Sequence, residues 1–195
     1  MNAFVPALRP VLFLDLDDVL CLNTPYGGYD VIQALSEVQK KTATLDHFGE
    51  MWAQLFVPAA KARLQALDEE FSPKYVMSTS WRRFLDKHAF QTVLQCCELE
   101  FVSSKLHENW QTPSFLSSQL RSREVGCWFD ENTEQRGNWV VLDDEHSGTG
   151  LDRWLVKEDL ACIVLCRAGV GLTDVEYARL RAAFVLRIEQ SAKSA

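Results

Sequence analysis

The chain has 195 residues, of which 47% are hydrophobic and 24% are charged, and this composition excludes a disordered protein. Its length favours one domain over residues 1–195, large enough to bury a core without disulfides or structural metal ions. The formal net charge of -7 excludes general electrostatic binding to nucleic acid, so a bound anion would need a metal ion or a few placed basic side chains.

The hydrophobic pattern predicts that short buried strands alternate with helices. The first strand is Val11-Leu12-Phe13-Leu14, a continuous apolar run that suits a strand buried on both faces of a parallel sheet. The elements predicted after it are helices at about 30–40 and 57–70, a strand at 75–77, a helix at 81–97, a strand at 99–102, a helix near 115–130, strands at 139–142 and 163–165, and a helix at 174–190. This order predicts an α/β domain with a mostly parallel sheet.

Two of these helices begin at recognisable signals. Pro58 stands in the first turn of the helix at 57–70, where a proline is tolerated because its missing N–H has no helical partner there. Thr173 and Glu176 have the T-x-x-E spacing of a capping box, which predicts that the last helix begins beside them.

The cysteines do not form the pattern of a disulfide framework. Cys96 and Cys97 are adjacent, and the other four lie in apolar stretches, where free cysteine packs as a small hydrophobe. No C-x-x-C pair is present to hold zinc, and a reducing, cytoplasmic compartment is expected. The first residues lack the apolar run of a signal peptide, and no segment approaches the roughly 18 apolar residues of a membrane span, so no membrane partner is expected.

Polar residues follow three of the predicted strands. They are Asp15 and Asp17 after the first strand, Ser78 and Thr79 after the strand at 75–77, and Asp143 and Asp144 after the strand at 139–142. In open parallel sheets the ligand crevice lies beyond the carboxyl ends of the strands. If these strands are neighbours, four carboxylates meet in a small volume, where their charges repel unless a cation intervenes. Such an oxygen-rich cluster suits Mg²⁺.

Three motifs in this order resemble the signatures of one superfamily. VLFLDLDDVL has an apolar strand followed by D-x-D, VMSTSWR has a strand that ends in Ser or Thr, and WVVLDDE has a strand that ends in paired acids. They resemble the first, second and fourth signatures of the haloacid dehalogenase (HAD) superfamily. With the G-L-T before the last helix, they look closer still to the small HAD-like domains of RNA-repair proteins and their stand-alone bacterial relatives. The resemblance implies a three-layer, Rossmann-like fold with a minimal cap.

The resemblance also implies a role for each acid. Asp15 would attack phosphorus and form an aspartyl-phosphate. Asp17 would protonate the leaving group, then activate water, and would lend its backbone carbonyl to the metal. Asp143 would bind Mg²⁺ together with Asp15, and Asp144 would help directly or through water.

A hydroxyl and a basic side chain would hold the phosphoryl group. Ser78 would hydrogen-bond one of its oxygens, with Thr79 as the alternative. The third signature of the family is a basic residue, usually Lys, yet the segment SSQLRSREVGCWFDE before the fourth contains none. We take Arg123 for this role, because Arg keeps the charge and adds a fork suited to phosphate. Arg121 and then Lys105 are the alternatives.

Two further features bear on rate and substrate. Asp18 stands where the family often has Gly and adds a negative charge at the mouth of the site. Residues 21–54 leave room for a flap, a small cap insertion, but not for a large closed cap. An open site suits either a bulky substrate, such as a nucleic-acid end, or a range of small phosphorylated molecules.

These expectations favour a Mg²⁺-dependent phosphatase that hydrolyses a phosphomonoester. One alternative is a polynucleotide end phosphatase in RNA repair, for which a basic groove around Arg82, Arg83, Arg121 and Arg123 would count, while the net charge counts against it. A haloacid dehalogenase is less expected, because those enzymes do not need the paired metal-binding acids. A catalytically silent binding module is the remaining alternative, since Asp18 and the missing Lys depart from the family pattern.

Overall fold

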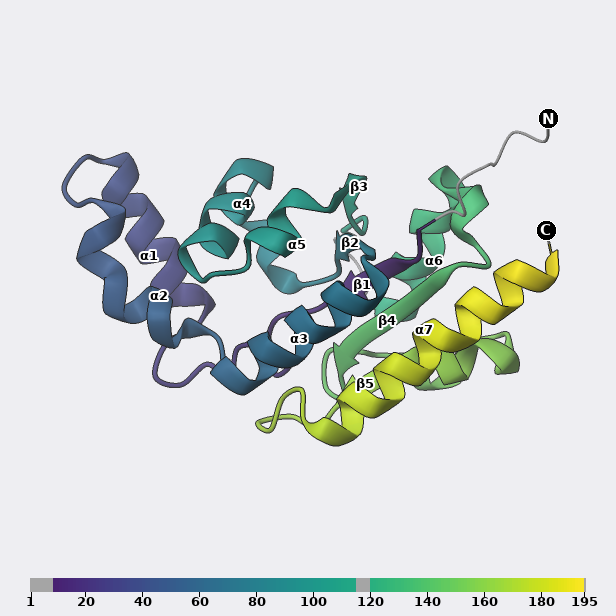
Figure 1. Ribbon diagram of the computed structural model, residues 1–195. Coiled ribbons are helices and arrows are strands. Elements are labelled where there is room, and N and C mark those ends of the chain that lie inside the picture. Colours follow the sequence, from purple (N-terminus) through teal and green to yellow (C-terminus); the bar gives the residue numbers. More distant parts are fainter. Residues whose placement is uncertain (1–8, 115–119, 195) are drawn as a thin grey trace, which may run out of the picture.

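A parallel sheet of five strands forms the centre of the protein, and helices cover both of its faces (Figure 1). The computed structural model describes residues 9–114 and 120–194. The strands are β1 Val11–Leu14, β2 Lys74–Met77, β3 Leu106–Gln111, β4 Trp139–Asp144 and β5 Ile163–Cys166. Their order is β3-β2-β1-β4-β5, and every neighbouring pair is parallel. The predicted three-layer α/β fold is confirmed.

Strand β1 lies at the centre of the sheet, between β2 and β4. All four of its side chains are buried. Leu12 and Leu14 pack into the core on one face, while Val11 and Phe13 pack into the core on the other. A strand enclosed on both faces has no solvent side, which explains why its sequence is apolar without alternation.

The helices form two unequal layers. They are α1 Gly28–Gln39, α2 Gly49–Leu55, α3 Pro58–Phe71, α4 Lys87–Cys96, α5 Glu100–Ser104, α6 Arg121–Glu131 and α7 Asp174–Ser194. Residues of α3, α4, α5 and α7 pack on the face of Leu12 and Leu14, and α3 runs beside α7 in Figure 1. Helix α6 covers the other face, where Trp128 and Phe129 contact the ring of Phe13 edge-on at centroid distances of 5.1 and 5.5 Å.

The predicted strand at 99–102 is wrong, because most of this segment belongs to helix α5. Leu99 and Val102 are both buried, and a spacing of three residues places two side chains on one side of a helix. The third strand is β3, which lies at the edge of the sheet and pairs only with β2. Its residues LHENWQ are mostly polar and partly exposed, so they carry no apolar run that would identify a strand.

The predicted helix at 81–97 is also wrong in its first part. Residues Ser80–Arg83 form a separate 3-10 turn, and α4 begins only at Lys87. The break occurs at Asp86, whose Oδ1 accepts the N–H of Ala89 at 2.8 Å and caps a new helix. At the other end of the chain, the predicted capping box is confirmed: Glu176 Oε2 accepts the N–H of Thr173 at 3.2 Å, directly before α7.

Residues 21–54, which we call the flap, contain α1 and most of α2, and these helices lie at one end of the molecule in Figure 1. Met51, Trp52 and Leu55 of α2 are buried in the core. The indole Nε1 of Trp52 donates a hydrogen bond to the carbonyl of Leu45 at 3.0 Å and so ties α2 to the turn before it.

All six cysteines are free thiols. Cys21, Cys97, Cys162 and Cys166 are buried, which agrees with their predicted role as small hydrophobic side chains. Among the described residues, no helix combines the length and the apolar character needed to cross a membrane.

Candidate active site

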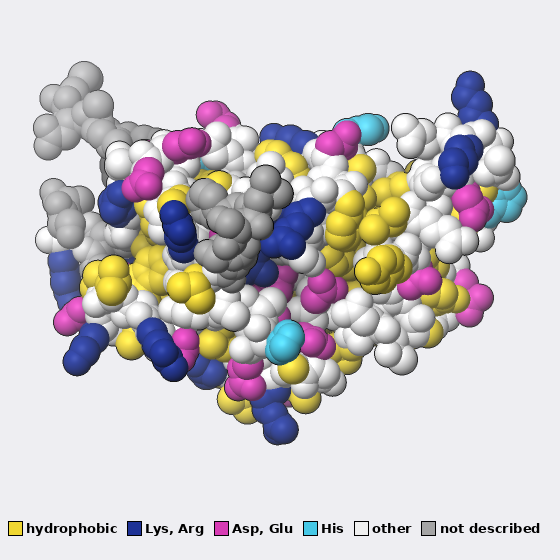
Figure 2. Space-filling view, turned by 180° about the vertical axis from the view of Figure 1, so that it is seen from behind, with side chains coloured by type: hydrophobic (Ala, Val, Ile, Leu, Met, Phe, Trp, Pro, Cys, Tyr) yellow, Lys and Arg dark blue, Asp and Glu magenta, His cyan; other side chains and the backbone are white. Residues whose placement is uncertain are grey.

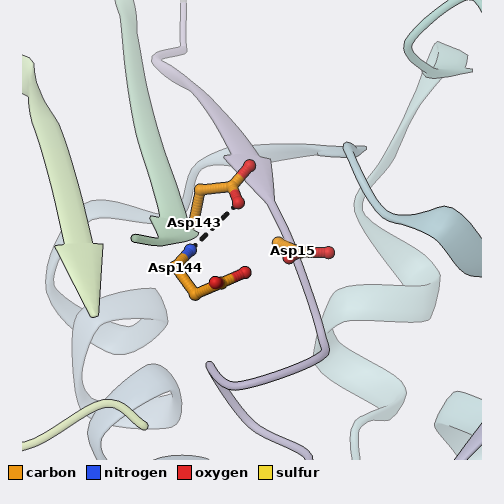
Figure 3. A group of neighbouring side chains, drawn as sticks. All are labelled: Asp15, Asp143 and Asp144. Carbon is orange, nitrogen blue, oxygen red and sulfur yellow. Dashed lines mark hydrogen bonds between the residues drawn. The ribbon is translucent and has the colours of Figure 1, made fainter. Parts of the chain in front are cut away.

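Three carboxylates meet at the carboxyl edge of the sheet (Figure 3). Asp15 directly follows β1, and Asp143 and Asp144 are the last two residues of β4. The two strands are paired so that Leu14 lies opposite Leu142, which brings their ends to the same level. One oxygen from each acid lies within 4.8 Å of one from each of the others, and all three side chains are buried.

Burial makes this concentration of negative charge unfavourable without a counter-charge. Burial, and then the neighbouring charge of Asp143, raises the pKa of Asp15 well above its usual range, against the opposing effect of Arg121. Burial likewise raises the pKa of Asp143, although Arg121 and Ser147 both favour its charged form. The site therefore favours any group that brings positive charge to these oxygens.

Arg121, the first residue of α6, supplies one such charge from within the protein. Its Nε lies 2.8 Å from Asp143 Oδ2, and its Nη2 lies 3.8 Å from Asp15 Oδ1. The contact with Asp143 is an ion pair, because the N–H does not have the direction of a hydrogen bond. The arginine side chain is only 6% exposed. Arg121, the second choice for the basic role, thus lies directly beside the acids.

Arg123 is exposed, because two residues along a helix correspond to a rotation of about 200°. Lys105, the third choice, precedes β3 and therefore lies at the opposite edge of the parallel sheet. Its Nζ forms an ion pair with Asp68 Oδ2 at 2.6 Å. We therefore replace Arg123 by Arg121 as the candidate for the basic role.

A chain of buried charges holds Arg121 in place. Glu124 lies between two guanidinium groups, with Oε2 3.1 Å from Nη1 of Arg121 and Oε1 2.6 Å from Nη2 of Arg82. Arg82 in turn donates to the carbonyls of Thr79 and Thr112. Both guanidinium groups are therefore committed to contacts within the protein, although Arg82 also forms part of the lining of a cleft beside Arg83.

The hydroxyls of Ser78 and Thr79 differ in what they contact. Ser78 N donates to the carbonyl of Leu14 at 2.8 Å, which extends the pairing of β1 and β2 by one residue, to the level of Asp15. Thr79 Oγ1 accepts the N–H of Trp81 and begins the 3-10 turn. Within the described part of the chain, the buried Ser78 Oγ has no hydrogen-bond partner, so this hydroxyl remains available to a ligand.

Ser147 belongs to the site, although the sequence analysis did not identify it. Its Oγ lies 2.9 Å from both Asp15 Oδ2 and Asp143 Oδ1 and also contacts Asp144 Oδ2. The signal was the turn after β4: Asp144 Oδ1 accepts the N–H groups of His146 and Ser147, as in an Asx turn. This turn brings the Ser147 hydroxyl into contact with all three acids.

The turn also requires the glycine that follows Ser147. A Cβ on Gly148 would lie 2.5 Å from the carbonyl oxygen of Asp144, closer than real side chains approach. The D-x-x-S-G spacing from Asp144 to Gly148 therefore reflects a backbone that curves tightly around the acids.

Asp17 and Asp18 are not part of the cluster of Asp15, Asp143 and Asp144, and their carboxylates bond to other described residues. Asp17 accepts hydrogen bonds from side chains of the flap and of the turn after β2. Asp18 adopts a left-handed φ of 53°, a region that favours glycine, and its Oδ1 accepts the N–H of Gly169 at 2.8 Å. The backbone conformation thus gives a physical reason why glycine would suit the position of Asp18.

The donor set fits a hard divalent cation. Within the described residues, the cluster offers carboxylate oxygens alone, which Mg²⁺ prefers to the nitrogen and sulfur ligands typical of zinc sites. Asp15 Oδ1 and Asp143 Oδ2 are buried and make no hydrogen bond to any described residue. Both oxygens lie near the Arg121 guanidinium without a hydrogen bond to it, so each keeps acceptor capacity for a ligand. Asp15, Asp143 and Asp144 could therefore hold such an ion.

Comparison with known proteins adds one match. A family model described as "HAD domain in Swiss Army Knife RNA repair proteins" covers residues 11–177, which include every residue of the site. No curated protein matches the chain. No solved structure matches it either.

Proposed function

We propose that this chain, which belongs to the family of HAD domains in Swiss Army Knife RNA repair proteins, is a Mg²⁺-dependent phosphomonoesterase. The observation that carries the proposal is the buried group Asp15, Asp143 and Asp144, two of whose oxygens face Arg121 but accept no hydrogen bond from a described residue. The free hydroxyl of Ser78 and the guanidinium of Arg121 complete a site for a phosphoryl group beside these acids.

Asp15 is the nucleophile in this proposal. A carboxylate oxygen of Asp15 attacks phosphorus, the bond from phosphorus to the ester oxygen breaks, and Asp17 donates a proton to the leaving oxygen. Asp17 then takes a proton from water as that water attacks the aspartyl-phosphate. Inorganic phosphate leaves, and the carboxylate of Asp15 is restored.

The other residues stabilise charge during these steps. Asp15, Asp143 and Asp144 would hold the ion, and bound Mg²⁺ would neutralise negative charge and orient the phosphoryl group. Ser78 donates a hydrogen bond to a phosphoryl oxygen. Arg121 offsets the charge that remains on Asp15 and the phosphoryl group, and it needs no movement because Glu124 already holds it.

Phosphate release from a broad panel of phosphomonoesters, measured with and without Mg²⁺, tests this proposal. The Asp15→Asn variant should lose turnover while its circular dichroism and melting temperature show a folded protein. Asp152→Asn is a matched control, because Asp152 is exposed and, among the residues that the structure describes, forms an ion pair only with the exposed Arg153. An unmodified chain that binds Mg²⁺ but hydrolyses no ester would instead support a silent binding module.

A cleft beside the site favours a second, narrower candidate, a polynucleotide end phosphatase. The cleft has a volume of about 490 Å³ and includes Arg83, Phe84, Lys87 and Trp110 in its lining. Arg83 and Lys87 are exposed and form no ion pair with a described residue, and Phe84 is 43% exposed. Cations beside aromatic rings suit a single nucleic-acid strand, whose phosphates and bases they can contact together.

This binding would be local, because basic side chains are interspersed with acidic ones on the face that Figure 2 shows. The test compares kcat/KM for an end-phosphorylated RNA oligonucleotide and for a free nucleotide. Joint replacement of Arg83 and Lys87 by Ala should lower the value for the oligonucleotide alone. An equal effect on both substrates would contradict this candidate.

The thiols suit a reducing compartment, and we place the activity in the cytoplasm. Burial raises the pKa of both Cys21 and Cys97 to about 12, so these thiols are protonated and unreactive at neutral pH. All six cysteines are free, and the fold requires no disulfide.

A further inference from the structure

The indole of Trp81 joins the flap to Asp17. Its Nε1 donates a hydrogen bond to Asp17 Oδ2 at 3.0 Å, and Ser80 Oγ donates to the same oxygen at 3.2 Å. The other oxygen, Oδ1, accepts from Asn23 Nδ2 of the flap at 3.2 Å. Three donors from two separate segments therefore fix the plane of this carboxylate.

The indole itself has little freedom to rotate. Trp81 is 1% exposed and stacks on Phe56 with a centroid distance of 6.1 Å and an angle of 25° between the rings. Phe84 packs against it at 6.4 Å, and the backbone N–H of Trp81 is bonded to Thr79 Oγ1. The direction of the Nε1–H bond is consequently set by core packing.

The flap rests directly on this ring. A Cβ on Gly28, the first residue of α1, would lie 3.2 Å from Trp81 Nε1 and 3.3 Å from Cε2, so the flap backbone touches the edge that carries the N–H. Asn23 is enclosed in the same way, since a Cβ on Gly27 would meet its Oδ1 at 2.2 Å. The flap, Trp81 and Asp17 thus form one packed unit.

From this contact we infer that Trp81 is a positioning residue, which orients the Asp17 carboxylate toward the leaving oxygen of the substrate. The inference rests on the proposed function, because the role of Asp17 in proton transfer belongs to it. A proton donor must stand within hydrogen-bond reach of the oxygen that receives the proton. Trp81 acts through Asp17 and makes no contact with the reacting atoms.

The Trp81→Phe variant tests the inference, because it removes the N–H and keeps an aromatic ring in the core. The measurement is kcat/KM for two esters, p-nitrophenyl phosphate and glycerol 2-phosphate. The nitrophenolate leaves without a proton, whereas the alkoxide needs one. Because general acid catalysis contributes about 10²–10⁴-fold, we expect the variant to lose roughly tenfold more activity on the alkyl ester than on the aryl ester.

Two companion variants calibrate this measurement. Asp17→Asn should show the same selective loss with a larger factor. Trp52→Phe is the matched control, since Trp52 is also buried and donates its N–H, but to the carbonyl of Leu45 in the flap. A loss of core packing alone would lower kcat/KM for both esters by the same factor, and this is the result expected for Trp52→Phe.

A second variant covers the case in which Trp81→Phe does not fold. Gly28→Ala pushes a methyl group against the indole edge and should give a selective loss in the same direction, though smaller. The inference would be overturned if every folded variant at Trp81 and Gly28 lost kcat/KM equally for both esters while Asp17→Asn lost it selectively for the alkyl ester. That result would leave the proposed function intact. An unmodified chain that hydrolyses neither ester would overturn both.

Discussion

Arg121 and Asp143 form a buried ion pair, with 2.8 Å between Nε and Oδ2, that joins the start of α6 to the end of β4. The same guanidinium faces Asp15 and is held by Glu124. Three elements thus contribute to the site: α6 supplies the cation, while β1 and β4 supply the acids. Three measurements probe this arrangement, and a fourth probes the packing of His107 against Trp128 of α6.

Loss of Arg121 should destabilise the protein strongly. Replacement by Ala leaves Asp15 and Asp143 without their buried counter-charge and Glu124 with Arg82 alone, and removal of one partner of a buried pair costs about 3–5 kcal/mol. Urea unfolding in EDTA measures the loss. Arg136→Ala, which removes an exposed guanidinium paired with the exposed Asp130, should change the free energy of unfolding by less than about 1 kcal/mol. Similar losses in the two variants would contradict the placement of Arg121.

Mg²⁺ should stabilise the folded protein through the acid cluster. An ion that binds only the folded state adds about 2.7 kcal/mol when its concentration is 100 times its Kd. We expect a rise in melting temperature with Mg²⁺ that EDTA reverses and that Asp143→Asn abolishes. The exposed Asp152→Asn should keep the full shift, and a shift that survives in Asp143→Asn would place the ion elsewhere.

Ser147 should matter most when metal is absent. Its hydroxyl contacts all three acids, and a hydrogen bond to a charged group contributes about 1.5–3 kcal/mol. Ser147→Ala should therefore lower the free energy of unfolding in EDTA, and saturating Mg²⁺ should reduce the difference because the ion satisfies the same oxygens. Ser104→Ala provides the control, since Ser104 is exposed and its hydroxyl donates to the Phe101 carbonyl, far from any acid of the site in the sequence. An equal loss in EDTA and in Mg²⁺ would argue against this placement of the hydroxyl.

His107 should make stability depend on pH in the mildly acidic range. Burial of the imidazole, which packs edge-on against Trp128 at 5.0 Å, lowers the pKa of His107 below its ordinary value of 6.5. The unfolded chain then binds this proton more readily than the folded one, so stability falls as the pH drops from above 6.5 toward the lowered folded pKa. Urea unfolding at pH 7.5 and 5.5 should show a smaller fall in His107→Gln, whereas exposed His88→Gln should behave like the unmodified chain.

Much of the fold could be predicted from local patterns. The apolar run Val11-Leu12-Phe13-Leu14 predicts a strand enclosed on both faces, because only apolar side chains are stable there. The acids after this strand and at the end of β4 predict a charged edge, since parallel strands place their carboxyl ends together. Strand β3 was not predicted, because an edge strand is partly exposed to solvent and tolerates polar residues, so its sequence has no apolar run.

The partners of the acids depended on packing between distant segments. Arg121 and Arg123 are chemically equal in the sequence, and only the rotation of α6 against the sheet decides which one is buried beside Asp143. Ser147 reaches the acids through a turn, and Trp81 reaches Asp17 from a segment 64 residues away. Hydrophobic periodicity reports which face of an element is buried, but it does not report which side chains meet across the core. The chain alone therefore establishes the fold class and the acids, while their placement against Arg121, Ser147 and Trp81 follows from the tertiary fold.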